Sequence, residues 1–286
     1  MAVKISLINM KGGVGKSTLT VNLAWHFAGY LEWSKRVLVV DLDPQFKASQ
    51  YLLGVSEYEK ILNSKKPTIW NIFEQGTKTP GAKSSALKAS DVILTHRTFT
   101  NGGSPTGGCI HLIPSQLELA YSLKNPGQNK ERRLAKLLSE VEDQYDLILI
   151  DCAPTESVLT TAAYLSSDWL LVPVKPEYLS TIGLPLLVNS MQEFKSEYDE
   201  SKLELAGVVF NAASNYFPEE ALAKRTVKEI AKKNGWYVFT SGVSYSRSYP
   251  KGAREGQPIF RTSYRRWSQV KTFQQFAEEF AKRVGL

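Results

Sequence analysis

The sequence predicts an α/β fold in which a mainly parallel, twisted β-sheet is flanked by helices on both faces. Short apolar runs rich in β-branched residues alternate along the chain with longer segments of helical composition, which is the order of βαβ units. Several of these runs are apolar throughout, as expected for strands that are covered on both sides. No long linker and no internal repeat divides the chain, so we expect a single domain over residues 1–286.

Each expected strand is marked by its own apolar run. The longest helical patterns between these runs cover residues 18–30, 129–143 and 184–198. Residues 76–108 are rich in Gly, Ser, Thr and Lys, which predicts a flexible insertion in the domain. The expected strands, in chain order, are residues 3–9, 36–43, 110–114, 146–151, 168–174, 204–211 and 236–240.

The composition excludes several classes of protein. No run of 18 apolar residues is present, so we expect no transmembrane helix. The first residues lack the ordered regions of a signal peptide. The two cysteines, Cys109 and Cys152, form neither a disulfide framework nor a metal-ligand spacing. These features indicate a cytoplasmic protein with reduced thiols.

A glycine-rich stretch, MKGGVGKST at 10–18, lies between the first strand and the first helix. Strand, glycine loop and helix in this order form a phosphate-binding loop, in which backbone N–H groups and a helix N-terminus face phosphate oxygens. Lys16 is expected at the terminal phosphates, Ser17 on Mg²⁺ and Thr18 at an inner phosphate. The strict pattern requires glycine where Met10 stands, and the loop contains a second lysine, Lys11.

Three acidic residues follow buried strands. Asp41 and Asp43 end the run VLVVDLD, and Asp151 ends DLILID. A nucleotide hydrolase needs a group that orients the attacking water and ligands for Mg²⁺. We therefore expect Asp43 to position the water and Asp151 to hold the Mg²⁺ shell. Asp41 is expected to order the loop or to be linked to Mg²⁺.

The motif KGGVGKST resembles the deviant Walker A motif of the ParA/MinD family of P-loop ATPases. The sequence D-x-D-P-Q at 41–45 and the Asp151 strand are similar to the switch I and Walker B motifs of that family. The resemblance implies ATP and Mg²⁺ as cofactors and a homodimer that encloses two ATP molecules. It also implies that Lys11 reaches the phosphates of the partner protomer, where a cation offsets charge during phosphoryl transfer.

The resemblance extends over most of the chain. The segments at 111–120, 172–184 and 207–214 are similar to family segments. It implies that Asn211 hydrogen-bonds adenine, with Pro176 and Glu177 beside the base. The phosphate-binding residues that it implies are Gly12, Gly13, Val14, Gly15, Lys16, Ser17 and Thr18.

Two features depart from the family pattern. Phe46-Lys47 stands after the D-P-Q sequence where small residues and Asn are usual, which affects the expected behaviour of switch I. No helix-turn-helix segment precedes the first strand, so sequence-specific operator binding is not expected. We also expect slow intrinsic hydrolysis, stimulated by a partner or DNA, because the motifs include no arginine finger.

The charge of the chain is concentrated at its C-terminal end. The formal net charge is +7, and residues 224–286 contain 14 Lys and Arg but only 4 Asp and Glu. Such a region favours a polyanion. The stretch at 244–260 resembles a family segment that binds DNA without sequence preference, which implies Arg247 as a contact. Basic residues that follow it within a short span are expected to contact DNA too: Arg254, Arg261, Arg265, Arg266 and Lys271. Trp267 is expected to pack at the core side of the last helix.

The sequence therefore predicts a ParA-like ATPase that dimerises on ATP, binds DNA non-specifically, and is released by hydrolysis. It would act in plasmid or chromosome partitioning with a ParB-like adaptor and associate with the nucleoid in its ATP state. Two alternatives within the family are positioning of a protein cargo and a MinD-like membrane switch. The membrane alternative is disfavoured because Glu278 and Glu279 would oppose an anionic surface. Two alternatives belong to other classes of function. One is an iron–sulfur enzyme with the same fold, and the other is a binding module whose nucleotide site is inactive.

Overall fold

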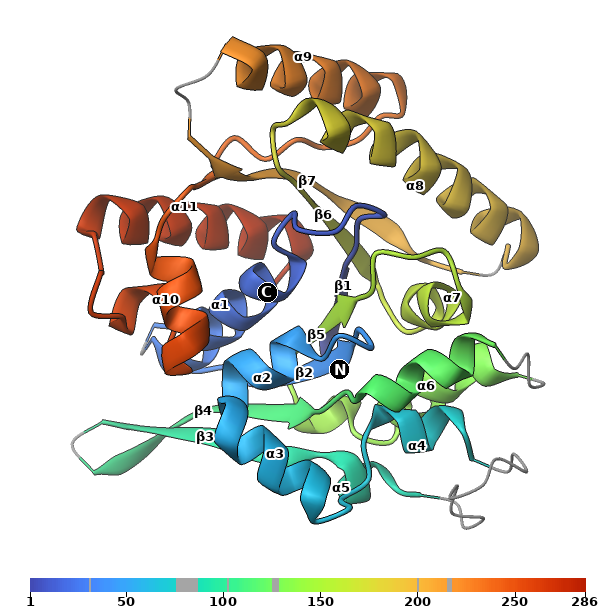
Figure 1. The fold of residues 1–286 in the computed structure, drawn as a ribbon, viewed down its shortest axis with the longest axis vertical. Coiled ribbons are helices and arrows are strands. Elements are labelled where there is room, and N and C mark those ends of the chain that lie inside the picture. Colours follow the sequence, from blue (N-terminus) through green and yellow to red (C-terminus); the bar gives the residue numbers. More distant parts are fainter. Residues whose placement is uncertain (31, 76–86, 102, 125–128, 200, 215–217) are drawn as a thin grey trace.

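The fold is built around one eight-stranded sheet (Figure 1). The computed structural model describes residues 1–286 except 31, 76–86, 102, 125–128, 200 and 215–217. The strands lie in the order β3-β4-β2-β5-β1-β6-β7-β8, and all neighbours are parallel except β3 and β4. The bounds are β1 Val3–Leu7, β2 Arg36–Leu42, β3 Leu94–Asn101, β4 Ser104–Ile113, β5 Leu147–Cys152, β6 Trp169–Val174, β7 Glu204–Ala213 and β8 Val243–Ser244.

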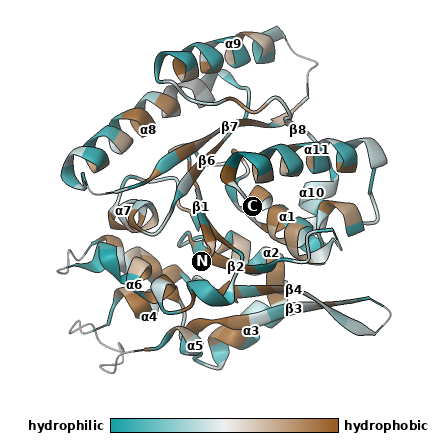
Figure 2. Ribbon diagram, turned by 180° about the vertical axis from the view of Figure 1, so that it is seen from behind, coloured by the Kyte–Doolittle hydropathy of each residue, from teal (hydrophilic) through white to brown (hydrophobic). Residues whose placement is uncertain are grey.

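Helices cover both faces of the sheet, as the sequence predicts. The core on one face includes residues of α1, α2 and α11, and the core on the other includes residues of α4, α6, α7, α8 and α9. Figure 2 shows apolar central strands and polar outer sides on α9 and α11. The helix bounds are α1 Lys16–Gly29, α2 Lys47–Leu53, α3 Val55–Asn63, α4 Ile69–Phe73, α5 Ala89–Val92, α6 Arg133–Ser139, α7 Val158–Leu165, α8 Tyr178–Glu197, α9 Pro218–Lys233, α10 Ser248–Glu255 and α11 Trp267–Val284.

The unbroken apolar runs are explained by this double coverage. Along β2, Val37 and Val39 belong to the core under α1, while Leu38 and Val40 belong to the opposite core. Successive side chains of a strand point to opposite faces, so a strand buried on both needs apolar residues at every position.

Two expectations about strands are wrong. Residues 236–240 do not form a regular strand: a single parallel bridge joins Val238 to Val208, and β8 pairs with β7 instead. Trp236 and Val238 are apolar because they pack against the core. The strand expected at 110–114 is longer, since β4 begins at Ser104.

The flexible insertion expected at 76–108 is also wrong for much of its length. Residues 94–101 form β3, which pairs antiparallel with β4, and 89–92 form α5. Residues 76–86 lie outside the described residues. Strand β3 is at the edge of the sheet, where backbone pairing requires few apolar side chains, and only Phe99 in it is buried.

Candidate active site

The phosphate-binding loop joins β1 to α1 near the middle of the sheet. Gly13 and Gly15 have left-handed backbone angles, with φ of +77° and +91°. A Cβ on Gly15 would lie 2.1 Å from Nδ2 of Asn211. Glycine is therefore required at position 15 both by the backbone and by the neighbouring amide.

Lys16 is folded over its own loop. Its Nζ donates to the carbonyl oxygens of Asn9 at 3.0 Å and Lys11 at 3.2 Å, and 6% of the residue is exposed. Burial lowers the pKa of Lys16, and the nearby carboxylate of Asp151 opposes this change. Among the described residues, the hydrogen bonds of this buried cation go to carbonyl oxygens, so it is suited to receive an anion.

Asp41 and Asp151 lie side by side because they are paired in register on β2 and β5. The Asp41 carboxylate accepts hydrogen bonds from Ser49 N at 2.7 Å, Ser49 Oγ at 2.6 Å and Asp43 N at 3.2 Å. Burial nevertheless raises the pKa of Asp41 to about 7. These bonds tie the end of β2 to the start of α2, and both expected roles of Asp41, in ordering the loop and in binding Mg²⁺, stay predictions.

Asp151 has no such support. Both carboxylate oxygens are buried, and among the described residues neither has a partner with full hydrogen-bond geometry. Burial, and then the charge of Asp41, raise the pKa of Asp151 well above its usual range, while the Ser17 hydroxyl lowers it. A buried, unpartnered carboxylate beside a serine hydroxyl fits one side of a Mg²⁺ site.

The protein oxygens alone do not complete a metal site. In the described part of the chain, no group of three or more His, Cys, Asp or Glu side chains could hold a metal ion. Mg²⁺ commonly takes only one or two carboxylates and fills its remaining positions with phosphate oxygens and water. The donors present therefore fit Mg²⁺ carried by a nucleotide.

A cavity of about 480 Å³ lies over the loop. The charged residues that line it are Lys16, Asp43, Lys47 and Arg254, and Lys11 is not among the lining residues. Asp43 is 6% exposed, and its Oδ1 accepts from Gln45 N at 2.9 Å. The complete lining is Gly12, Gly13, Gly15, Lys16, Ser17, Thr18, Asp43, Lys47, Gln50, Tyr51, Val55, Pro154, Ala253 and Arg254.

A second cavity of similar size, about 510 Å³, lies at the amino ends of β1 and β6, where its lining includes Lys4 and Asp168. The amino ends of parallel strands are opposite to the ends that carry the loop and the carboxylates. Because it contains none of these groups, we assign the site to the smaller cavity over the loop.

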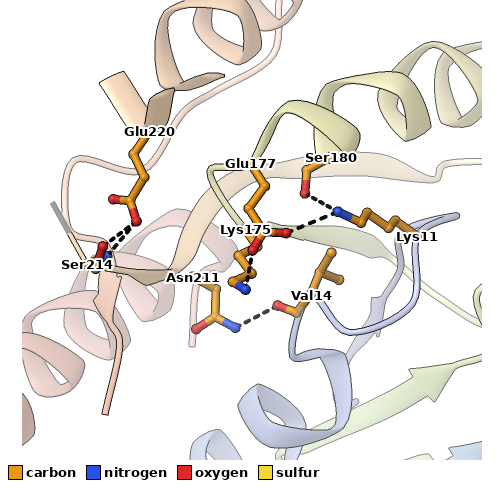
Figure 3. Close-up of polar contacts among 8 residues, drawn as sticks. All are labelled: Lys11, Val14, Lys175, Glu177, Ser180, Asn211, Ser214 and Glu220. Atoms are coloured by element: carbon orange, nitrogen blue, oxygen red, sulfur yellow. Dashed lines mark hydrogen bonds and ion pairs between the residues drawn. The ribbon is translucent and has the colours of Figure 1, made fainter. Parts of the chain in front are cut away.

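Lys11 is held within its own chain (Figure 3). Its Nζ lies 3.3 Å from Glu177 Oε2 and 3.1 Å from Ser180 Oγ, at the start of α8. Glu177 also pairs with Lys175. These two lysines lower the pKa of Glu177, Lys175 most strongly. Lys11 and Lys16 thus occupy different surroundings although they belong to one loop.

Asn211 contacts the phosphate-binding loop directly (Figure 3). Its Nδ2 donates to Val14 O at 2.7 Å, and 4% of the residue is exposed. This bond ties the end of β7 to the loop. The expected contacts of Asn211, Pro176 and Glu177 with adenine stay predictions, and Glu177 is engaged by lysines in this structure.

The altered switch I sequence has a structural explanation. Phe46 caps α2 with a left-handed φ of +43°, a conformation unfavourable for a bulky residue. Its ring stacks on Tyr58, with centroids 5.1 Å apart and an interplanar angle of 17°. The stacking offsets the backbone cost, and the next residue, Lys47, lines the cavity.

The expected DNA contacts do not share one environment. Arg254 lines the cavity over the phosphate-binding loop, and the Arg261 guanidinium lies 5.3 Å from the ring centroid of buried Trp25. Trp267 does not pack on the core, because it is 69% exposed with the Arg265 guanidinium 4.7 Å from its ring. All six candidates are exposed, and the remaining four lie near the ends or surface of α10 and α11: Arg247, Arg265, Arg266 and Lys271.

The apolar side of the last helix is buried. Phe273, Phe276 and Phe280 are fully buried and Val284 is 5% exposed, all in the core that includes α1. No helix in the described residues is long and apolar enough to cross a membrane. Cys152 is buried too, so its thiol is not placed to share a cluster across a surface.

Comparison with known proteins decides the family. A family model described as an AAA domain matches residues 2–205. The chain is 32% identical over 259 residues to the sporulation initiation inhibitor protein Soj of Bacillus subtilis, covering 89% of each chain. The chain belongs to the ParA/Soj-type P-loop ATPases.

Further similarities extend beyond the matched model. The chromosome-partitioning ATPase Soj of Treponema pallidum is 27% identical to this ParA/Soj-type ATPase over 100% of its chain and 99% of the relative. A putative plasmid partition protein of Borrelia burgdorferi, solved with AMPPNP, superposes with a TM-score of 0.73 at 22% identity, covering 99% and 100% of the two chains. At that identity the likeness shows the fold.

The family model ends before the basic end of this ParA/Soj-type ATPase. All of residues 224–286, including α10 and α11, lie after residue 205. The sequence does not predict that Lys47 and Arg254 line the cavity over the phosphate-binding loop. The unusual Phe46-Lys47 pair was the one available signal for the first, and no local motif signalled the second.

Proposed function

We propose that this ATPase is a nucleotide-controlled DNA-binding switch that partitions a plasmid or chromosome with a ParB-like adaptor. It binds Mg²⁺-ATP, dimerises around two nucleotides, binds DNA without sequence preference, and leaves DNA after hydrolysis. Lys16, Ser17 and Asp151 hold the Mg²⁺-nucleotide, and Asp43 orients water. In the ATP state the protein is associated with the nucleoid.

The observation that carries the proposal is the position of Lys11. It stands in the phosphate-binding loop, yet it does not line the cavity that this loop forms. A cation of the loop that is not used by its own cavity is available to the nucleotide of a second protomer. Its present partners, Glu177 and Ser180, are side chains that it can exchange for phosphate oxygens.

The DNA part of the proposal is supported by the charge of the C-terminal end. Arg247, Arg265, Arg266 and Lys271 are exposed, and a dimer doubles their number. Each phosphate neutralised releases condensed counterions, so binding should fall steeply with salt. The relatives named for chromosome and plasmid partition support this use of the fold.

The test is binding to unrelated linear DNA at several salt concentrations, with ATP and with ADP. We expect binding in ATP that weakens strongly with salt, and its loss in Lys11→Ala. Lys4→Ala is a matched control, because Lys4 is a similarly buried, ion-paired lysine at the other end of β1. Equal binding in ATP and ADP would rule out the switch.

A further inference from the structure

Arg254 occupies a position that its expected role does not explain. It lies in the last turn of α10 and lines the cavity over the phosphate-binding loop. Its side chain has no hydrogen bond or ion pair to any described residue. The neighbouring acid, Glu255, pairs with Lys251 at 3.1 Å instead. An exposed arginine without a carboxylate partner therefore faces the same space as Lys16.

The charges around this space are unbalanced. Three cations, Lys16, Lys47 and Arg254, line the cavity together with one carboxylate, that of Asp43. Two of them, Lys47 and Arg254, lie outside the phosphate-binding loop. A guanidinium presents several N–H donors in a fixed fork that suits phosphate oxygens, so a polyphosphate is the ligand that this set favours.

The helix that carries Arg254 is seated closely on the switch I helix. A Cβ on Gly252 of α10 would lie 2.8 Å from Tyr51 Oη and 2.4 Å from Gln257 O, so the two helices touch at this glycine. Asn22 of α1 donates to Tyr51 Oη at 3.1 Å and accepts from Ile259 N at 2.8 Å. Asn22 of α1 is thus hydrogen-bonded both to α2 and to the segment after α10.

We propose that Arg254 is a phosphate-contacting residue for the bound nucleoside di- or triphosphate, supplied by the same chain from α10. The inference rests on the proposed nucleotide binding, and it replaces DNA contact as the main role of Arg254. Under this proposal the two ends of α10 have different functional roles. Arg247, a DNA candidate, caps its start, and Arg254 reaches the nucleotide from its last turn.

The experiment measures nucleotide affinity directly, without DNA and without turnover. A fluorescent ADP analogue is titrated into the wild type, Arg254→Ala and Arg254→Lys, and the bound analogue is then displaced with ADP. Because ADP is not expected to support the sandwich dimer, the readout reports contacts within one chain. Lys251→Ala is the matched control. It removes a cation from the same helix, and this cation pairs with Glu255.

We expect Arg254→Ala to weaken ADP binding about tenfold, the size of one charge-assisted hydrogen bond. Arg254→Lys should lose less, and Lys251→Ala should match the wild type. Unchanged ADP affinity in Arg254→Ala, with normal thermal unfolding, would overturn the inference. If the wild type itself bound no nucleotide, the proposed function would fail instead, so the two failures are distinguishable.

Discussion

A buried ion pair between Lys130 and Glu74 joins the segment before α6 to the end of α4. Lys130 Nζ lies 2.7 Å from Glu74 Oε1, their side chains are 0% and 1% exposed, and Ser122 Oγ donates to the same oxygen at 2.7 Å. Removing Lys130 takes away the buried cation that pairs with this carboxylate, and breaking a buried ion pair costs about 3–5 kcal/mol. We therefore expect Lys130→Met to lower the free energy of unfolding by about that amount in urea titrations.

The control for this prediction is an exposed pair. Lys60 and Glu57 are 74% and 55% exposed, so Lys60→Met should change stability by only about 0–1 kcal/mol. Replacing both buried partners, in Lys130→Met with Glu74→Leu, should recover much of the loss. A double variant as unstable as the single one would contradict this account.

At the same scale, Glu177 competes for Lys11. If Lys11 must leave Glu177 to reach a second nucleotide, Glu177→Gln should favour the ATP dimer. The pair is partly exposed, with side chains 23% and 45% accessible, so the gain is limited to about 1 kcal/mol, or roughly fivefold in dimer affinity. Sedimentation velocity with ATP, in an Asp43→Ala background, measures it.

Ser180→Ala is the companion variant, because it removes the second contact of Lys11 without changing charge. Its effect should have the same direction and be smaller. A dimer weakened by both substitutions would mean that these side chains position Lys11 for its partner rather than retain it.

At the scale of elements, one glutamate anchors α11 to the segment before β8. Glu279 accepts hydrogen bonds from Tyr237 Oη, Thr240 N, Thr240 Oγ1 and Ser241 N, each between 2.7 and 2.8 Å. Partial burial raises the pKa of Glu279, but these bonds outweigh it and lower the pKa to about 2.

The lowered pKa of Glu279 determines how the stability of the fold depends on pH. Because the folded pKa is below the unfolded value, the stabilisation is complete above about pH 4.5 and is lost as pH falls toward 2. Glu279→Gln should destabilise the protein by about 1–2 kcal/mol at pH 7, a figure reduced for solvent screening. The difference from wild type should vanish at low pH in urea titrations, and Glu278→Gln, next to it, should show no such trend.

Elements that are marked by a pattern of neighbouring residues were predictable from the sequence. Strands β2, β5, β6 and β7 agree with apolar runs to within a few residues, because burial on both faces leaves no room for polar positions. Strand β3 was missed, since an edge strand with mostly exposed side chains has the composition of a loop. The segment at 236–240 was over-assigned, because apolar side chains report burial and not backbone pairing.

The residues of the candidate site also fall into a predictable group and an unpredictable group. The phosphate-binding loop and the three acids were predictable because their signals lie within short stretches. Lys47 and Arg254 were not placed in the cavity, because only the packing of α2 and α10 brings them beside the loop. Likewise, nothing local indicates that Arg261 lies over Trp25, 236 positions earlier in the chain.

At the scale of the whole molecule, the basic region and the phosphate-binding loop with its neighbouring acids occupy different parts of the sequence. The loop and acids fall within residues 10–151, whereas 14 of the 35 basic residues lie in 224–286. Helix α10 is where the two parts meet, since it contacts α2 and borders the cavity. Helix α10 thus places part of the basic end directly beside the cavity over the phosphate-binding loop.

The place of β1 at the centre of the sheet has a consequence for synthesis on the ribosome. This strand emerges first, yet its two neighbours, β5 and β6, begin only at residues 147 and 169. Until both have left the exit tunnel, an apolar strand stays unpaired, which delays folding and invites aggregation. Ribosome-bound chains stalled before β6 emerges should be cleaved readily by protease, and chains stalled after β7 emerges should resist it. The central strand of the sheet therefore stays unpaired until more than half of the chain has been translated.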